Sequence, residues 1–272
     1  MEYLQTQGIR LPRLGLGTFR MQGDACRAAV ESALDLGYRH IDTAEMYDNE
    51  REVGEGLHAS GVKRKDVWVT TKVWQSHLSP HDLERSTKES LARMRLTEVD
   101  LLLIHWPNPQ IPLAETIGAL CKMKSVGYAR HIGVSNFTVP LLKEAAALAT
   151  EPLVTNQIEW HPYLDQSAVV AQTRRLGMAV TAYSPIARGR AAGDATLKAI
   201  GAAHKKTAGQ VSLRFLIQEG AAVIPRTSKV ERLTENLSVF DFELSAAEMD
   251  QIRKLARPSG RIVDWGGAPK WD

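Results

Sequence analysis

The feature that most constrains the fold of this 272-residue chain is a regular alternation of short apolar segments with longer amphipathic segments. The apolar segments have the length and composition of β-strands, and the segments between them have apolar residues at helical spacing. This pattern predicts eight strands, each followed by a helix. The strands are predicted at residues 14–18, 38–41, 67–72, 99–106, 129–134, 154–160, 178–183 and 221–226.

Strict alternation over ~250 residues is typical of a (β/α)8 TIM barrel. Unbroken apolar runs such as 99–106 indicate parallel strands covered on both faces. A doubly wound sheet would also alternate, but it usually opens with a glycine-rich phosphate turn, and GLGTF at 15–19 is a weak match. We therefore predict one barrel domain spanning 1–272, with an N-terminal β-hairpin and two extra helices, one before the last strand and one at the end.

Composition and charge exclude several other classes of protein. The chain has 44% hydrophobic and 24% charged residues, as soluble globular proteins do. Its 34 basic and 31 acidic side chains give a net charge of +3, which argues against nucleic-acid or membrane partners. Cys26 and Cys121 lie in predicted helices without metal spacing. The first residues lack the pattern of a signal peptide, so a cytoplasmic protein is expected.

Four polar residues stand at or just after successive predicted strands: Asp42, Tyr47, Lys72 and His105. In a parallel barrel these strand ends share one face, so the four side chains are expected to meet at one mouth. An ammonium group near a phenol is expected to lower the pKa of Tyr47, while Asp42 holds Lys72 in place. His105 could donate a hydrogen bond to a substrate oxygen. This set suits reduction of a carbonyl, for which a bound cofactor must supply the hydride.

Each of these residues also has a structural interpretation when it is taken alone. Asp42 could cap a turn, and His105 could be a hydrogen-bonded histidine of the core. His77 and His81 are four residues apart, but Ser79 begins a helix there and no third ligand is evident, so no metal site is predicted. The presence of Asp42, Tyr47, Lys72 and His105 at successive strand ends favours a catalytic role over coincidence.

The chain resembles the aldo-keto reductase family over nearly its whole length. The similarity rests on the order and spacing of seven motifs: GYRHIDTAEMYDNEREVG, TTKVW, LLLIHWP, IGVSNF, NQIEWHPY, TAYSPIARG and VIPRTSKVERLTEN. Within the family, the chain is most similar to the prokaryotic 2,5-diketo-D-gluconate reductases. The resemblance implies a barrel that binds NADPH in an extended form. It also implies a catalytic tetrad of Asp42, Tyr47, Lys72 and His105, with Tyr47 as the proton donor.

The resemblance also implies a set of cofactor contacts. Ser135, Asn136 and Gln157 match the residues that hold the nicotinamide carboxamide, and Tyr183 matches the ring that stacks on the nicotinamide. The remaining matches lie along the pyrophosphate, the 2′-phosphate and the adenine: Ser184, Ile186, Arg226, Thr227, Ser228, Arg232, Glu235 and Asn236. Two guanidinium groups at the start of a helix suit a dianionic phosphate. The family more often has lysine where Arg226 stands, so the strength of NADPH preference stays open.

Four aromatic residues follow strand ends and are expected to wall the substrate pocket: Phe19, Trp74, Trp106 and Trp160. The C-terminal segment with Trp265 is expected to fold over the mouth. His161 is expected to be structural. Arg188 and Arg190 could contact cofactor phosphate or only solvate a loop.

We expect an NADPH-dependent reductase of aldehydes or ketones, acting on keto-sugar acids such as 2,5-diketo-D-gluconate and on methylglyoxal or small aldehydes. One alternative is a barrel that binds NADP(H) as a redox sensor or partner-binding protein without significant turnover. Another is the same enzyme running in reverse as a dehydrogenase. By resemblance, a monomer with a small-molecule carbonyl substrate is expected.

Overall fold

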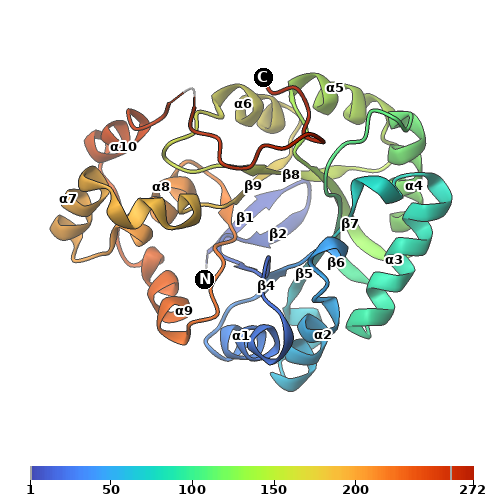
Figure 1. Cartoon of the computed structure of the whole chain (residues 1–272), viewed down its shortest axis with the longest axis horizontal. Helices are drawn as coiled ribbons and strands as arrows, with labels where there is room; N and C mark the ends of the chain where they lie inside the picture. Colours follow the sequence, from blue (N-terminus) through green and yellow to red (C-terminus); the bar gives the residue numbers. More distant parts are fainter. Residues whose placement is uncertain (1, 258) are drawn as a thin grey trace.

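The structure is a computed structural model that describes residues 2–257 and 259–272. Its main sheet has eight parallel strands, paired in chain order. Parallel bridges from Leu14 to Val223 and from Gly17 to Arg226 join the first strand to the last, so the sheet closes into a barrel (Figure 1). The strands are β3 (Leu16–Gly17), β4 (His40–Asp42), β5 (Trp68–Val73), β6 (Val99–Ile104), β7 (Ala129–Ser135), β8 (Leu153–Glu159), β9 (Ala179–Tyr183) and β10 (Ala222–Val223). The predicted (β/α)8 fold is confirmed.

A ring of helices surrounds the barrel (Figure 1). Those that follow strands are α1 (Gly23–Asp35), α2 (Glu50–Ala59), α3 (Pro80–Met94), α4 (Leu113–Ser125), α5 (Val139–Leu148), α6 (Ser167–Arg175), α8 (Ala208–Gln218) and α9 (Val230–Leu237). The two extra helices are α7 (Ala195–His204) and α10 (Ala246–Arg253), as predicted. No helix in the described residues is both long and apolar enough to cross a membrane.

Local sequence explains where several helices begin. The Ser79 side chain accepts a hydrogen bond from the backbone of Asp82, and proline occupies the first position of α3. Helix α10 begins with a capping box, in which Ser245 and Glu248 satisfy each other's backbone amides. These caps fix where the two helices begin.

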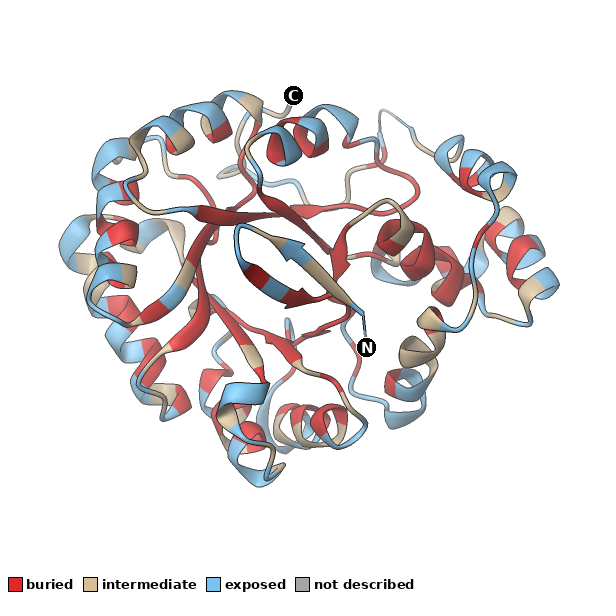
Figure 2. Cartoon of the chain, turned by 180° about the vertical axis from the view of Figure 1, so that it is seen from behind, coloured by how far each residue is buried: buried red, intermediate tan, exposed pale blue. Residues whose placement is uncertain are grey.

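The N-terminal hairpin closes one end of the barrel. It consists of β1 (Tyr3–Thr6) and β2 (Ile9–Pro12), which pair antiparallel across a turn at Gln7 and Gly8. Figure 2 shows it lying across the barrel from behind. Its residues Ile9 and Leu11 pack with apolar side chains inside the barrel, among them Leu101 and Leu103. This end is therefore sealed by apolar contacts.

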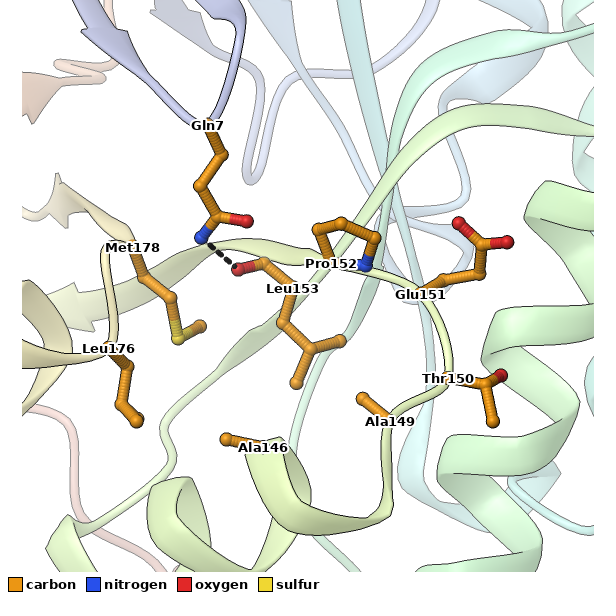
Figure 3. Close-up of a pocket in the computed structure, with 9 residues that line it drawn as sticks. All are labelled: Gln7, Ala146, Ala149, Thr150, Glu151, Pro152, Leu153, Leu176 and Met178. Atoms are coloured by element: carbon orange, nitrogen blue, oxygen red, sulfur yellow. Dashed lines mark hydrogen bonds between the residues drawn. The ribbon is translucent and has the colours of Figure 1, made fainter.

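A pocket of about 340 Å³ lies beside this hairpin (Figure 3). Its lining includes Gln7 and the residues just before β8 and β9, which places it at the amino-terminal end of the strands. The Gln7 amide donates to the carbonyl of Leu153 there. The pocket's one charged lining residue, Glu151, pairs with Lys124. The pocket therefore lies away from the strand ends where chemistry was predicted.

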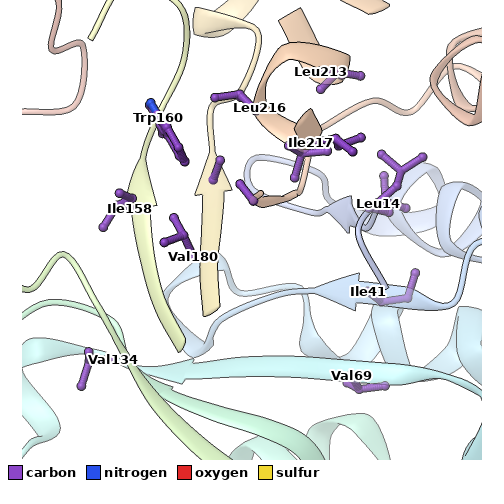
Figure 4. Packing of buried hydrophobic residues seen from close by; sticks show 14 of the residues in the cluster. Leu14, Ile41, Val69, Val134, Ile158, Trp160, Val180, Leu213, Leu216 and Ile217 are labelled. Atoms are coloured by element: carbon purple, nitrogen blue, oxygen red, sulfur yellow. The ribbon is translucent and has the colours of Figure 1, made fainter. Parts of the chain in front are cut away.

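The period-2 alternation of the strands separates two sets of buried residues. Ile41 and Val69 point outward into the main hydrophobic cluster between barrel and helices (Figure 4). His40 and Asp42, on either side of Ile41, are also buried, and Asp42 bonds inside the barrel to Lys72 of β5 and Gln157 of β8. The alternation thus places polar side chains inside the barrel, while the apolar side chains on its outer face pack against the helices.

The first and last strands are shorter than predicted. The sequence predicted 14–18 and 221–226, whereas β3 and β10 each have two residues. Pro225 has no N–H for a ladder hydrogen bond. At Gly17 an added Cβ would lie 2.7 Å from the carbonyl oxygen of Ile224, so the two chains meet closely there. The barrel closes at this point through isolated bridges rather than long strands.

Candidate active site

The structure brings the four predicted catalytic side chains together at the carboxyl ends of the strands. Asp42 ends β4, Lys72 lies in β5 and His105 directly follows β6. Tyr47 ends a 3-10 turn, η1 (Glu45–Tyr47). The Lys72 Nζ lies 2.5 Å from Asp42 Oδ1, 2.8 Å from the carbonyl oxygen of Thr43 and 3.5 Å from Tyr47 Oη. The lysine thus connects the acid to the phenol.

Asp42 is held on both sides of its carboxylate. One oxygen accepts from Lys72, and the other accepts from Gln157 Nε2 at 2.7 Å. Gln157 lies on β8, across the barrel from β4. Asp42 and Lys72 are 1% and 0% exposed, so the pair is screened from water. Burial lowers the pKa of Lys72, and the adjacent Asp42 opposes that shift.

The expected lowering of the pKa of Tyr47 is wrong. Burial raises the pKa of this phenol well above its usual range, and the negative charge of Asp42 raises it further. The physical reason is that Lys72 lies a full ångström closer to Asp42 than to Tyr47, so the carboxylate balances the ammonium charge. Tyr47 is therefore a protonated phenol at neutral pH.

His105 is neutral for a similar reason. Burial lowers its pKa well below the usual value, and the charge of Lys72 lowers it further. Its ring meets those of Tyr47 and Trp74 edge-on, with centroids 5.5 and 5.1 Å away. Its buried Nδ1 has no hydrogen-bond partner within the described residues. A neutral imidazole carries one N–H, which is able to donate to a substrate oxygen.

The residues predicted to hold the nicotinamide end of a cofactor adjoin this cluster. Asn136 donates from Nδ2 to the carbonyl of His105 at 2.9 Å, and its Oδ1 accepts from Tyr183 Oη at 2.8 Å. Ser135 donates to the carbonyl of Gln157 at 2.8 Å. Asn136 has a left-handed backbone with φ of 62°, which turns the chain at the end of β7. These residues form one hydrogen-bonded group with the tetrad.

The residues predicted at the phosphate end gather around the start of α9. Arg226, Ser228 and Arg232 are exposed, and Thr227 accepts a hydrogen bond from the backbone of Lys229. No side chain caps the first amides of α9. Such an uncapped start with cations beside it suits an anion.

Other predicted cofactor contacts differ in what surrounds them. Ser184 and Ile186 are half-buried in the loop after β9. The Glu235 carboxylate accepts a hydrogen bond from Thr207 Oγ1 at 2.5 Å. The backbone carbonyl of Glu235 accepts one from Gln210 Nε2. Asn236 is half-buried. Glu235 therefore also fastens α9 to α8.

Three of the four predicted pocket aromatics lie beside the tetrad. Phe19 packs on Tyr47 with centroids 5.0 Å apart, and Trp74 packs on His105. Trp265 stacks on Trp74 at 5.5 Å and 17°, and it meets Trp106 edge-on at 5.6 Å. The C-terminal segment therefore folds over the mouth as expected, and Figure 1 shows it crossing the strand ends.

Trp160 does not join this group. It is 7% exposed and packs in the main hydrophobic cluster with Ile158, Val180 and Leu216 (Figure 4). No aromatic contact connects it to the other three within the described residues. The prediction that Trp160 walls the pocket finds no support in this placement.

Two acids at the mouth, one half-buried and one buried, were not predicted. Glu45, in the turn that carries Tyr47, accepts from the backbone N–H of Trp74 and from Ser86 Oγ, and it contacts His77 Nδ1 at 3.0 Å. It therefore fixes the tyrosine turn against the Trp74 loop. The only sequence signal was its place inside a catalytic motif.

The second such acid is Glu159, at the end of β8. It accepts from the backbone N–H groups of Ile262 and Val263 at 2.7 and 2.8 Å, and from His161 Nε2 at 3.0 Å. This contact hooks the C-terminal segment to the barrel and gives His161 a structural role, as expected. Across 2–257 and 259–272, no three His, Cys, Asp or Glu side chains gather as a metal site would require.

Comparison with known proteins agrees with this geometry. The model of the aldo/keto reductase family matches residues 13–257. The chain is 43% identical over 267 residues to methylglyoxal reductase DkgB of Escherichia coli O157:H7, covering 97% of this chain and 100% of that protein. It is 38% identical over 249 residues to glyoxal reductase of Bacillus subtilis, covering 91% and 90%.

A solved structure is also similar. The crystal structure of a candidate 2,5-diketo-D-gluconic acid reductase B superposes with a TM-score of 0.97 at 46% identity, covering 100% of this chain and 98% of that one. Sequence and fold thus agree over almost the whole chain. The chain therefore belongs to the aldo/keto reductase family and is an oxidoreductase that acts on carbonyl groups.

Proposed function

We propose that this protein reduces aldehydes and ketones to alcohols with NADPH, using Tyr47 as the proton donor. The observation that carries the proposal is the position of Lys72 Nζ, which contacts both Asp42 and Tyr47 inside the barrel. An ammonium in this place stabilises negative charge on the phenol oxygen at the moment when the proton leaves.

The residues around the mouth fit NADPH. Tyr183 offers a ring for the nicotinamide, while Ser135, Asn136 and Gln157 offer amide and hydroxyl groups for its carboxamide. The uncapped start of α9, with Arg226 and Arg232 exposed, fits the 2′-phosphate. Ser184, Ile186, Thr227, Ser228, Glu235 and Asn236 complete the set. When bound, the cofactor supplies the hydride that no side chain can supply.

The side chains divide the remaining work. The neutral His105 donates a hydrogen bond that orients the substrate carbonyl and polarises it. Tyr47 holds its proton until negative charge develops on that oxygen, which is then a much stronger base than a phenolate. Lys72 steadies the resulting phenolate, and Asp42, fixed by Gln157, keeps Lys72 in place. The aromatic wall excludes water from this exchange.

We propose methylglyoxal, small aldehydes and keto-sugar acids such as 2,5-diketo-D-gluconate as substrates. The relatives named for methylglyoxal and glyoxal support the small dicarbonyls, and the solved structure supports the sugar acid. We also propose that 1–272 acts as one domain, because both the hairpin and the C-terminal segment pack on the barrel. A monomer is proposed from the family resemblance alone.

The test is the Tyr47→Phe variant, assayed by loss of NADPH absorbance with methylglyoxal. Removing the acid is expected to lower kcat by about 10²- to 10⁴-fold. Tyr3→Phe, in the hairpin at the opposite end of the barrel, is the matched control and should keep full activity. Turnover by Tyr47→Phe close to that of wild type would refute the assigned proton donor. Absence of turnover by the wild type with a panel of carbonyls would favour a binding protein instead.

A further inference from the structure

One contact of Lys72 comes from the backbone rather than from a catalytic side chain. The carbonyl oxygen of Thr43, the residue after β4, accepts from Lys72 Nζ at 2.8 Å. An ammonium has three N–H donors, and here they face Asp42 at 2.5 Å, Thr43 at 2.8 Å and the Tyr47 phenol at 3.5 Å. The contact with Tyr47 is the longest of the three, so it is the one that a small shift of the chain would break.

The segment 43–49, which carries Tyr47, is closed on itself by a hydrogen bond between its two ends. Thr43 Oγ1 donates to Asn49 Oδ1 at 2.7 Å, and both residues are 0% exposed. The backbone N–H of Thr43 also donates to a backbone carbonyl of β5, which holds this end on the sheet. The segment therefore forms a short closed loop, with the Thr43 carbonyl and the phenol facing the same ammonium of Lys72.

The Asn49 side chain also holds the residues that pack on Tyr47. Its Nδ2 donates to the carbonyl oxygens of Thr18 at 2.8 Å and Met21 at 2.9 Å. Phe19, between them, lies against the Tyr47 ring with centroids 5.0 Å apart. Both N–H groups of the amide and its oxygen are thus bonded. A buried amide bonded in this way resists displacement, because each group that lost its partner would be left unpaired.

The next residue, Glu50, ties the start of α2 to the strand that carries Lys72. The Glu50 side chain is fully buried, and its carboxylate accepts from Thr71 Oγ1 and, at 2.8 Å, from Arg93 Nε. Thr71 directly precedes Lys72 in β5, with its side chain on the other face of the strand. Asn49 and Glu50 therefore anchor the closed loop on both sides and hold it in place relative to Lys72.

We propose that Asn49 is a positioning residue of the reaction, which acts through its hydrogen bond with Thr43 to set the distance between the Lys72 ammonium and the Tyr47 phenol. This inference rests on the proposed reductase function, in which Tyr47 gives the proton. Because Asn49 acts through the backbone of the proton donor, loss of its bond with Thr43 should slow proton transfer and leave the binding of NADPH unchanged.

The Thr43→Val variant tests this proposal, because valine has nearly the shape of threonine but no hydroxyl. We expect single-turnover reduction of methylglyoxal to slow about 10- to 100-fold, as small misplacements of catalytic groups do. The solvent deuterium isotope effect on that step should rise, since proton transfer becomes more strongly rate-limiting. The Kd for NADPH should stay within about twofold of wild type. A merely structural role of Thr43 would not change the isotope effect.

Thr173→Val is the matched control, since Thr173 is also 0% exposed and donates its hydroxyl to a backbone carbonyl, that of Val169 in α6. This control should keep the wild-type rate. Thr43→Ser keeps the donor and should recover most of the rate, and Thr43→Cys, a weaker donor, should lie between the serine and valine variants. In an Asn49→Ala background, Thr43→Val should cause little further loss, because the bond is already absent.

A wild-type rate for Thr43→Val would overturn the proposal. A slower rate with an unchanged isotope effect, or with weaker binding of NADPH, would also overturn it. If that variant does not fold, equal rates for Thr43→Ser and Thr43→Cys would be the contradicting result. Failure of the reductase function would appear differently, as an unimpaired Tyr47→Phe variant.

Discussion

The two parts of the proposed cofactor and substrate site are built in opposite ways. On the proton-donor side, Asp42, Lys72 and Gln157 are buried and bonded to one another. On the phosphate side, Arg226 and Arg232 are exposed, and the start of α9 has no side-chain cap. The first part is a preformed network inside the barrel, whereas the second is an open cationic surface.

This difference predicts how each part responds to change. A buried charge that loses its partner is strongly unfavourable, so substitutions in the network should reduce stability as well as rate. An exposed cation is already solvated, so its loss should affect only the affinity for an anionic ligand. Stability and function should therefore be coupled on one side and separate on the other.

Lys72→Met should have the largest effect. It removes the group beside the phenol and leaves Asp42 buried without its cation, so we expect kcat to fall at least 10²-fold and the free energy of unfolding to fall by about 3–5 kcal/mol. Urea unfolding and single-turnover reduction of methylglyoxal measure the two effects. Lys143→Met, at an exposed site on α5, is the control. A loss of rate without any loss of stability would contradict the expected coupling of the two effects.

The free energy of unfolding should also depend on pH through His40, which stands two residues before Asp42 on the same buried strand. Burial lowers the pKa of His40 to about 4, so the folded protein favours the neutral ring. Stability should be complete above about pH 6.5 and should fall with acid, by about 2 kcal/mol at pH 5 and about 3 kcal/mol at pH 4. In His40→Gln this part of the pH dependence should disappear from urea unfolding curves. An identical acid slope in both proteins would contradict it.

Arg232→Gln should have a smaller effect, confined to the cofactor. Loss of one guanidinium beside the proposed 2′-phosphate should raise KM for NADPH about tenfold and leave KM for NADH and the unfolding free energy unchanged. Arg51→Gln, exposed on α2, controls for general charge. Equal changes for both cofactors would place Arg232 outside the phosphate site.

The smallest expected effect is that of pH on kcat, which should not change near neutral pH. Because the pKa of His105 is well below its usual value and that of Tyr47 well above, neither group should titrate between about pH 6 and 9. The kcat for reduction should be flat in that range. A midpoint near pH 6.5 would show that His105 is more solvated than the structure indicates.

Much of this architecture was predictable from the sequence because it depends on local pattern. Strand–helix alternation predicted the barrel, and Ser79 predicted the start of α3. The positions of Asp42, Lys72 and His105 at successive strand ends predicted their convergence, since parallel strands end on one face.

What the sequence could not predict depends on contacts between distant segments. The pKa of Tyr47 depends first on how deeply the phenol is buried and then on the nearby charge of Asp42, and no spacing in the sequence reveals either. Trp160 follows a strand as Trp74 does, yet it packs in the main hydrophobic cluster. The path of the C-terminal segment depends on Glu159, which accepts from the backbone of Ile262 and Val263, and no local pattern in the sequence indicates this contact.

The hook at Glu159 has a consequence for engineering and evolution. It grips the C-terminal segment through two main-chain amides, which every residue except proline possesses. The side chains of that segment are therefore free to vary while its path over the mouth stays the same. Substitutions of these side chains could therefore change the choice of substrate without disturbing the catalytic residues inside the barrel.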